Sequence, residues 1–359
     1  MKRGQGCLIA VAAVLIGLSV PGTGHRLVFP PGAKQEEQSL KTPSVREFFA
    51  MNTIITMETY DKDKEKALDE AVQLIGRLDR LWSVADEKSE VYAINHHPDL
   101  PVKVSEETGE LVRFSLHMAR ETKGAFNPVV YPLVKAWGFT TGEYRIPKDE
   151  ELEELLSHTC YQKVKLDKGT VALPEQMEID FGAVGKGYAG DLAVQVLKSH
   201  GIHSAILNLG GNVALIGRNP DNSLWRVGIR SPYGEGTMGT LEAEDCHIIT
   251  SGGYERYFTG EDGTVYWHIL DPENGKPADS GIISATIVGR EGRMCDALST
   301  AVFVMGLHQA EEYWRIHEGF ELILVTDDNE IYVTQGLEEH FQLNEASRGI
   351  PVFVIRREV

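Results

Sequence analysis

The sequence predicts an α+β fold, in which helices and groups of short strands occupy separate stretches of the chain. Long helices are expected at residues 63–81 and 106–122, and two successive helices over 296–305 and to His317, whereas residues 204–283 are rich in short strands and glycine turns. No repeat of fixed short period is present, and strands and helices do not alternate regularly. This order favours α+β over an alternating α/β sheet.

The folded region is expected to begin with a strand over residues 46–60. An amphipathic helix follows over residues 63–81, because its apolar residues recur at helical spacing. These apolar residues are Ala67, Leu68, Ala71, Val72, Ile75, Leu78 and Leu81. A second helix covers residues 106–122 and stops at Gly124, since glycine readily ends a helix.

The elements expected next are a short acidic helix over residues 149–158, a hairpin over 163–173 that turns at 167–169, a strand over 177–181, and a helix that runs from a glycine-rich turn to His200 and ends at Gly201. After the strand-rich region, a helix over 296–305 and another to His317 precede strands that continue toward the C-terminus.

Residues 1–24 begin with two basic residues and continue as an uncharged stretch whose apolar part is residues 7–20. This is the layout of a secretion signal, and the uncharged stretch is just long enough to cross a bilayer. Because no A-x-A cleavage site follows, we expect an uncleaved membrane anchor. Cys7 stands at the start of the apolar run, whereas the lipid-modified cysteine of a lipoprotein follows the run, so lipidation is not expected. Residues 25–43 read as a linker, and the domain over 44–359 is expected on the outer side of the cell membrane.

Composition narrows the class of protein further. The chain has 359 residues, of which 42% are hydrophobic and 25% charged, as in soluble globular proteins. Its net charge of −18 argues against a nucleic-acid-binding protein, which would carry a basic surface. Cys160, Cys246 and Cys295 are odd in number and widely spread, so they indicate neither a disulfide framework nor a cysteine-rich zinc site.

Residues 185–190 read GKGYAG, a literal G-x-G-x-x-G between a predicted strand and a predicted helix. A dinucleotide-binding fold would place a carboxylate about twenty residues later, but residues 205–210 contain none. The spacing of a P-loop is also absent. Two interpretations remain: a glycine turn that packs a helix closely on a sheet, or a phosphate site made of main-chain N–H groups with Lys186 beside them.

Asp296 and Thr300 are one helical turn apart and would project from the same helix face. A carboxylate and a hydroxyl in this arrangement offer two oxygen ligands to a hard cation. The alternative is an aspartate that caps its helix and a threonine that bonds back to it.

Two further segments are candidates. Alternation along residues 266–272 places His268 and Leu270 on one face of a strand, where the histidine is either a packed residue or a base. Residues 124–128 read GAFNP and precede a second aromatic cluster at 137–139. Such a segment forms a packed corner or receives a flat ring system.

Taken together, several blocks resemble the FAD:protein FMN transferases of the ApbE family, in the family's order from about Phe49 to Tyr332. The blocks are DFGAVGKG (180–187), NLGGN (208–212), WRVGI (225–229), TSGGYERYF (250–258), HILDPENGKP (268–277) and CDALSTA (295–301).

The resemblance implies an α+β fold of two tunnelling-fold-like halves, with FAD in the cleft between them. It also implies a role for each matched residue. FAD would contact Asp180 and Lys186, and its flavin and adenine pockets would be lined by Met51, Ala125, Phe126, Asn127 and the main chain near Leu270. Mg²⁺ would be held by the carbonyl of Ala183 and by Asp296 and Thr300, together with FAD phosphate oxygens. His268 would accept the proton of the attacking hydroxyl.

The implied activity is transfer of FMN from FAD to a threonine or serine hydroxyl of an acceptor protein, with release of AMP. A flavin-bearing subunit of a membrane electron-transfer complex is the expected acceptor. The alternatives are an FAD pyrophosphatase and a non-catalytic FAD-binding surface protein. Asn127 stands where many relatives have aspartate, and Ala85 where relatives often have tyrosine. The chain's own Thr286 lies in a predicted strand and is not expected to be the acceptor.

Overall fold

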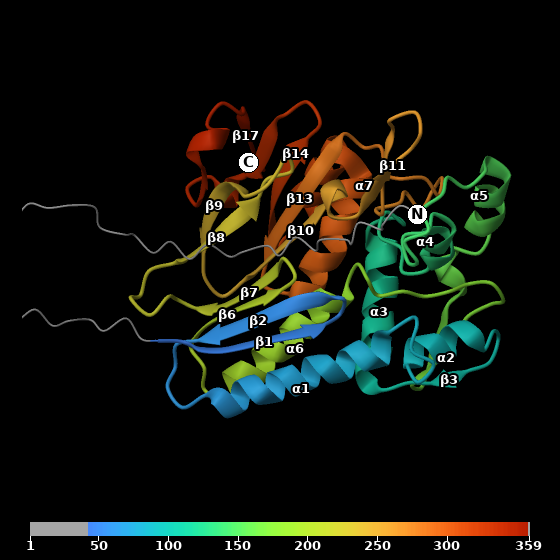
Figure 1. Ribbon diagram of the computed structural model, residues 1–359, viewed down its shortest axis with the longest axis horizontal. Helices are drawn as coiled ribbons and strands as arrows, with labels where there is room; N and C mark the ends of the chain where they lie inside the picture. Colours follow the sequence, from blue (N-terminus) through green and yellow to red (C-terminus); the bar gives the residue numbers. More distant parts are fainter. Residues whose placement is uncertain (1–41, 358–359) are drawn as a thin grey trace, which may run out of the picture.

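A nine-stranded sheet forms the centre of the protein in the computed structural model, which describes residues 42–357 (Figure 1). In spatial order its strands are β1 (Ser44–Ala50), β2 (Thr53–Thr59), β6 (Ser204–Leu209), β7 (Asn212–Gly217), β10 (His247–Gly252), β13 (Ile282–Gly289), β14 (Phe320–Thr326), β15 (Ile331–Thr334) and β17 (Val352–Ile355). Neighbouring strands are antiparallel except β15 and β17, which are parallel.

Seven helices are present in the described part of the chain. They are α1 (Glu65–Trp82), α2 (Glu90–His96), α3 (Glu106–Glu121), α4 (Tyr131–Ala136), α5 (Asp149–Leu156), α6 (Gly185–Ser199) and α7 (Gly292–Ile316). Helices α1, α6 and α7 cover one face of the large sheet: α1 packs on β1, α6 on β7, and α7 on β10, β13 and β14 (Figure 1). A largely antiparallel sheet with helices grouped on one face confirms the predicted α+β class.

The opposite face of the large sheet packs against a small sheet of β8 (Trp225–Arg230), β9 (Thr237–Ala243) and β16 (Phe341–Leu343). Side chains of a strand point alternately to its two faces. In β14, Leu322 and Leu324 join the core under the helices, whereas Ile323 and Val325 join the core under the small sheet. The central strands are therefore apolar on both faces because both faces are covered.

Two smaller sheets complete the described structure. One contains β3 (Val102–Lys103), β5 (Thr170–Ala172) and β4 (Lys165–Asp167), and the other is the hairpin of β11 (Tyr257–Thr259) and β12 (Val265–Trp267). Trp137 and Phe139 pack with Leu270 beside that hairpin as a separate apolar cluster. Within residues 42–357, no helix combines the length and the apolar character needed to cross a bilayer. The predicted anchor and nearly all of the predicted linker lie outside the described residues.

The predicted helices over 63–81, 106–122 and 149–158 are confirmed to within two residues at each end. The single strand predicted over 46–60 is wrong, because the chain folds there into the hairpin of β1 and β2. Met51 and Asn52 form its turn, and both have positive φ angles, 52° and 57°. Two such residues suit a tight turn whose twist matches that of the paired strands.

The strand predicted over residues 177–181 is also absent. The side chain of Asn95 binds both polar main-chain groups of Ile179: its Nδ2 donates to the carbonyl (2.9 Å) and its Oδ1 accepts from the N–H (2.8 Å). The N–H of Asp180 donates to the carbonyl of Pro128 at 2.9 Å. These bonds replace a strand partner, so the segment is fixed without joining a sheet.

Helix α7 begins at Gly292, one turn before the predicted start at Asp296. The predicted division after Met305 is confirmed, because Gly306 has φ 75° and ψ 171° and interrupts the helix. A Cβ atom at position 306 would lie 2.9 Å from the carbonyl oxygen of Ser280. Glycine therefore allows both the conformation and the close approach.

The three cysteines of the described part are free thiols. Cys295 is fully buried in α7, and burial raises its pKa well above the ordinary value for a thiol. Burial also raises the pKa of Cys246 to about 12.

Candidate active site

Helices α6 and α7 cross in close contact where both begin with glycine-containing turns. A Cβ atom at Gly187 would lie 2.2 Å from the carbonyl oxygen of Gly292 and 2.7 Å from the Cβ of Asp296. A Cβ at Gly292 would lie 2.5 Å from the carbonyl oxygen of Gly187. Both glycines are therefore required for the crossing. The glycine-rich segment at residues 185–190 therefore allows close packing of α6, which agrees with the first of its two interpretations, although the close partner is α7.

The carboxylate of Asp296 lies at this crossing and is only 4% exposed. Its Oδ2 accepts a hydrogen bond from the N–H of Gly187 at 2.8 Å, and its Oδ1 accepts one from Nδ2 of Asn212 at 3.0 Å. Each carboxylate oxygen has two lone pairs, so each keeps one for a further partner. Asp296 lies in the second turn of α7 and does not cap the helix, which excludes the capping interpretation.

Three hydroxyl groups gather next to Asp296. Ser251 of β10 has its Oγ 2.8 Å from Oγ of Ser299 and 3.4 Å from Oγ1 of Thr300. Ser299, not Thr300, bonds back to the helix, because its Oγ donates to the carbonyl of Asp296 at 2.8 Å. Among residues 42–357, the Thr300 hydroxyl therefore has only this long contact with Ser251 and is available to another partner.

The predicted metal ligands are all hard oxygen donors. Asp296 and Thr300 come from one side of α7, and Ala183 is in the turn that leads into α6, four residues before Gly187. Among residues 42–357 no cluster of three histidine, cysteine, aspartate or glutamate side chains is present. One carboxylate, a hydroxyl and a carbonyl suit Mg²⁺, which is usually held by one or two carboxylates plus substrate phosphates. The residues present therefore fit this ion.

His268 follows directly after β12, so the strand position predicted for it is wrong. Its Nδ1 lies 3.2 Å from the carbonyl oxygen of Arg256, which also accepts the main-chain N–H of His268 at 3.1 Å. A carbonyl only accepts, so the ring proton is on Nδ1 and Nε2 is the free proton acceptor. Burial lowers the pKa of His268 to about 4, with the positive charges of Arg256 and Lys186 acting in the same direction.

Lys186 is the second residue of α6, and its positive charge acts on both His268 and Glu255, where it lowers the pKa of each side chain. Burial raises the pKa of Glu255, and the positive charges of Lys186, Arg230 and Arg256 oppose that rise. Asp296 acts on the same carboxyl and raises its pKa. Cations from three segments therefore converge near the start of α6, which suits a ligand with several negative charges.

Asp180 lies just before α6 and is tied to the turn at residues 125–128. Besides the bond from its N–H to Pro128, its Oδ1 accepts from the N–H of Gly182 at 2.8 Å. Burial raises the pKa of Asp180, while the Gly182 N–H and the charge of Arg256 oppose the change. The structure therefore places Asp180 within range of the Arg256 charge, which also acts on His268.

In the turn at residues 125–128, the side chains of Phe126 and Asn127 are engaged within the protein, which leaves mainly the main chain for contact with a ligand. Phe126 is buried at 2% exposure and its N–H donates to Oγ1 of Thr122 at 3.1 Å. Asn127 donates from Nδ2 to the carbonyl of Thr159 (2.9 Å) and accepts at Oδ1 from the N–H of Val129 (3.1 Å). An aspartate could not donate to Thr159, so the amide at this position has a structural purpose in this chain. Ala125 is half-buried next to it.

Met51 and Leu270 occupy constrained positions. The N–H of Met51, in the β1–β2 turn, donates to Oδ1 of Asp79 at 3.0 Å. Leu270 is buried and pairs with Pro277 in an isolated bridge, so its side chain belongs to the apolar cluster. A role of its main chain in lining a pocket stays a prediction.

Sequence reasoning gave no role to Asn212, Ser251, Glu255 or Arg256. All four lie in blocks that carried the family resemblance, NLGGN and TSGGYERYF. Membership of these blocks was therefore the one sequence signal for a role in the site. The partners of these side chains come from distant segments, so the sequence did not reveal their contacts.

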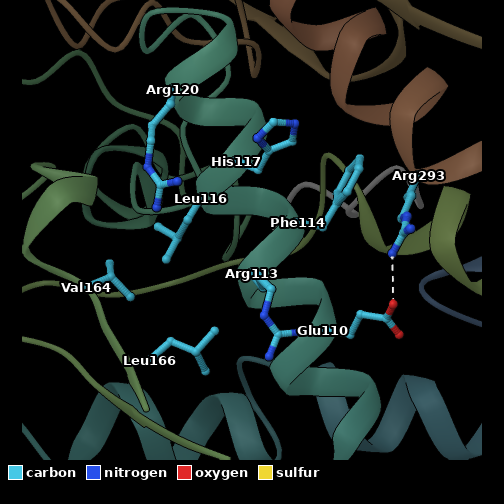
Figure 2. A pocket seen from close by; sticks show the side chains of 9 residues that line it. All are labelled: Glu110, Arg113, Phe114, Leu116, His117, Arg120, Val164, Leu166 and Arg293. Carbon is cyan, nitrogen blue, oxygen red and sulfur yellow. Dashed lines mark hydrogen bonds and ion pairs between the residues drawn. The ribbon is translucent and has the colours of Figure 1, made fainter. Parts of the chain in front are cut away.

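A cavity of about 630 Å³ lies elsewhere, beside α3 (Figure 2). Arg113 and Arg120 line it together with the apolar Leu166, and Arg293 of α7 reaches it from the side. The guanidinium of Arg293 lies 3.4 Å from Glu110 and stacks 4.6 Å from the ring centre of Phe114. None of the predicted site residues lines this cavity.

Comparison with known proteins identifies the relatives of this chain. Residues 51–324 match the ApbE family. An FAD:protein FMN transferase of Treponema pallidum is 30% identical over 329 residues, covering 84% of this chain and 91% of the relative.

Solved structures agree. The ApbE protein of Thermotoga maritima has a TM-score of 0.78 and 32% identity, covering 83% of this chain and 99% of its own. The flavin transferase ApbE of Vibrio cholerae has a TM-score of 0.74 and 26% identity, covering 83% of this chain and 100% of its own. Its structure is also known for a histidine-to-glycine mutant. This chain therefore belongs to the ApbE family.

Proposed function

We propose that this protein is an FAD:protein FMN transferase, which moves FMN from FAD to a threonine or serine hydroxyl of an acceptor protein. The observation that carries the proposal is the alignment of this chain, over nearly all of its described length, with relatives that bear this name. The basic groups around the start of α6, next to a neutral histidine and a buried carboxylate, support it.

The proposed step is attack of the acceptor hydroxyl on the FMN phosphorus of FAD. A new P–O bond joins FMN to the acceptor, and the bond from that phosphorus to the bridging oxygen breaks. AMP leaves with the electron pair, and the hydroxyl proton passes to a base. Phosphoryl transfer of this kind depends mainly on positioning and on neutralising charge.

His268 is proposed to receive the proton at Nε2, since Nδ1 is engaged with the carbonyl of Arg256. Its lowered pKa keeps the imidazole neutral at physiological pH, as a general base requires. Lys186 is proposed to bind the pyrophosphate through its ammonium group. The N–H groups of Gly185 and Gly187 on either side already donate to the carbonyl of Phe181 and to the Asp296 carboxylate. Asp180 and the main chain at residues 125–127, Met51 and Leu270 are proposed to hold the rest of FAD.

Asp296, Thr300 and the carbonyl of Ala183 are proposed to hold Mg²⁺. When bound, the ion would neutralise charge on the pyrophosphate. Within the protein, the bonds from Gly187 and Asn212 keep the Asp296 carboxylate in one orientation.

We further propose that the domain lies outside the cytoplasm, held at the cell membrane by residues 1–24, and that its acceptor is a flavin-bearing subunit of a membrane electron-transfer complex. The basic and apolar N-terminal sequence supports the location. A separate acceptor is supported by Thr286, which is completely buried in β13 between β10 and β14. Its Oγ1 lies 2.8 Å from Oγ1 of Thr250.

The test is to incubate the purified protein with FAD, Mg²⁺ and such a subunit prepared without flavin. We expect the acceptor to gain the mass of one esterified FMN, with one AMP released for each FMN attached. Release of AMP with free FMN and an unmodified acceptor would instead identify a pyrophosphatase, in which water is the nucleophile. FAD binding without AMP release would identify a non-catalytic binding protein.

A further inference from the structure

Helices α6 and α7 hold each other at two points that are one helical turn apart. At the first, the N–H of Gly187 in α6 donates to the Asp296 carboxylate of α7 at 2.8 Å. At the second, the N–H of Gly292 in α7 donates to the Asp191 carboxylate of α6 at 2.6 Å. Each helix thus supplies one carboxylate and one main-chain donor. This reciprocal arrangement limits sliding of one helix along the other.

Asp191 also supplies the N-terminal cap of α7. Its second oxygen accepts from the N–H of Arg293 at 2.9 Å, so one carboxylate binds the first two N–H groups of the helix. Glu291, which occupies the N-cap position, makes no side-chain cap bond. A carboxylate at a helix N-terminus satisfies unpaired donors and interacts favourably with the helix dipole. The position of the first turn of α7 therefore depends on a residue of α6.

His247 of β10 in turn holds Asp191. Its Nε2 lies 3.1 Å from Oδ1 of Asp191, and the two side chains are only 7% and 12% exposed. The imidazole ring packs against Gly190 and Gly292, where Cβ atoms would come within 3.5 Å and 2.6 Å of ring atoms. The ring therefore fills the space between the sheet and both helices, on the sheet face that α6 and α7 cover (Figure 1).

We propose that Asp191 and His247 are a positioning pair that sets the place of Asp296, and through it the affinity of the protein for its divalent cation. The inference rests on the proposed function, which assigns Asp296 and Thr300 to the metal. Both residues follow the capped turn on the same helix, so a shift of that turn moves both. Loss of a group that orients metal ligands typically weakens metal binding by about 10–100-fold.

The experiment measures FAD binding by flavin fluorescence at increasing Mg²⁺ concentration, in wild type and in Asp191→Asn. We expect the half-saturating Mg²⁺ concentration to rise about tenfold or more in Asp191→Asn, with FAD binding in EDTA unchanged. FMN transfer by the wild type is measured in parallel. Its absence would refute the proposed function, whereas the Mg²⁺ dependence of FAD binding tests the positioning pair.

Asp61→Asn is the matched control. Asp61 lies in the loop before α1. Its Oδ2 also accepts from two main-chain N–H groups, those of His203 (2.7 Å) and Ser204 (2.9 Å). A merely structural role predicts that both substitutions lower the melting temperature and that neither changes the Mg²⁺ requirement. The inference predicts a changed requirement in Asp191→Asn alone.

His247→Gln and His247→Leu provide an independent test if Asp191→Asn fails to fold. Glutamine keeps a polar group beside Asp191 and should need a Mg²⁺ concentration close to that of the wild type, whereas leucine removes the polar contact and should need more. An unchanged Mg²⁺ requirement in both Asp191→Asn and His247→Leu would overturn the inference. So would an equal shift in Asp61→Asn, or FAD binding by the wild type that is independent of Mg²⁺.

Discussion

Acidification of the assay distinguishes the half-buried His268 of this structure from an ordinary surface histidine. Its pKa is lowered to about 4, first by burial and then by the charges of Arg256 and Lys186. A lowered pKa means that the neutral base form persists as the pH falls and is lost only through about pH 4. The free protein should therefore keep its base in the reactive form well below neutrality.

The size of the effect follows from the two pKa values. At pH 5, a histidine with a pKa of about 4 is about 90% neutral, whereas one with the ordinary value of about 6.5 is about 3% neutral. We therefore expect kcat/KM for FAD at pH 5 to stay within about twofold of its value at pH 7.5, where an unperturbed base would lose about thirtyfold.

The assay is AMP release at limiting FAD, saturating Mg²⁺ and saturating acceptor, at constant ionic strength from pH 7.5 to 4.5. His268→Ala should lower transfer by about 10²–10⁴-fold with little change in FAD affinity, and its residual rate reports the titration of other groups. A decline of kcat/KM by tenfold per pH unit below 6.5, present in the wild type and absent from His268→Ala, would refute the reasoning. Because FAD brings negative charge near Lys186, we also expect the apparent pKa in kcat to exceed that in kcat/KM.

Three further outcomes are expected. Asp296→Ala should abolish AMP release at sub-saturating Mg²⁺, and EDTA should stop the wild type until Mg²⁺ is restored; near-normal turnover of the variant would show that Asp296 holds no metal. Gly187→Ala should lower the free energy of unfolding by about 1–3 kcal/mol, because its Cβ meets the Gly292 carbonyl at 2.2 Å; an unchanged urea midpoint would contradict the tight crossing. Prolonged incubation with FAD and Mg²⁺ should leave the mass of the wild type unchanged, and an FMN adduct mapped to Thr286 would demonstrate self-modification.

Helix α1 was predictable from sequence because its apolar residues recur at helical spacing, and the ends of α3 and α6 were predictable because Gly124 and Gly201 follow them. The β1–β2 hairpin was missed because its turn, Met51–Asn52, lacks the glycine or proline that usually marks a turn. The strand predicted over 177–181 was wrong because an asparagine 84 residues away along the chain binds its main chain. No local pattern contains such a partner.

The candidate site, too, was predictable in part from the sequence. Spacing alone suggested that Asp296 and Thr300 share a helix face, and the family resemblance supplied the candidate roles. The bonds of Asp296 to Gly187 and Asn212 join segments 109 and 84 residues apart, so they depend on the crossing of α6 and α7 over the sheet. The contact between His268 and Arg256 likewise requires the β11–β12 hairpin to bring the two residues together. The two tunnelling-fold-like halves implied by the resemblance stay a prediction.

The buried thiol of Cys295 and the half-buried thiol of Cys246 bear on how the protein withstands oxidation. Only the thiolate form of cysteine attacks disulfides and reacts readily with oxidants. At neutral pH, Cys246, with a pKa of about 12, and Cys295, raised well above its ordinary value, hold almost no thiolate. Both thiols should therefore react slowly with disulfides and oxidants, although they are unpaired. Of the three free thiols between residues 42 and 357, these two should contribute little to adventitious cross-linking, and the half-buried Cys160 is the third.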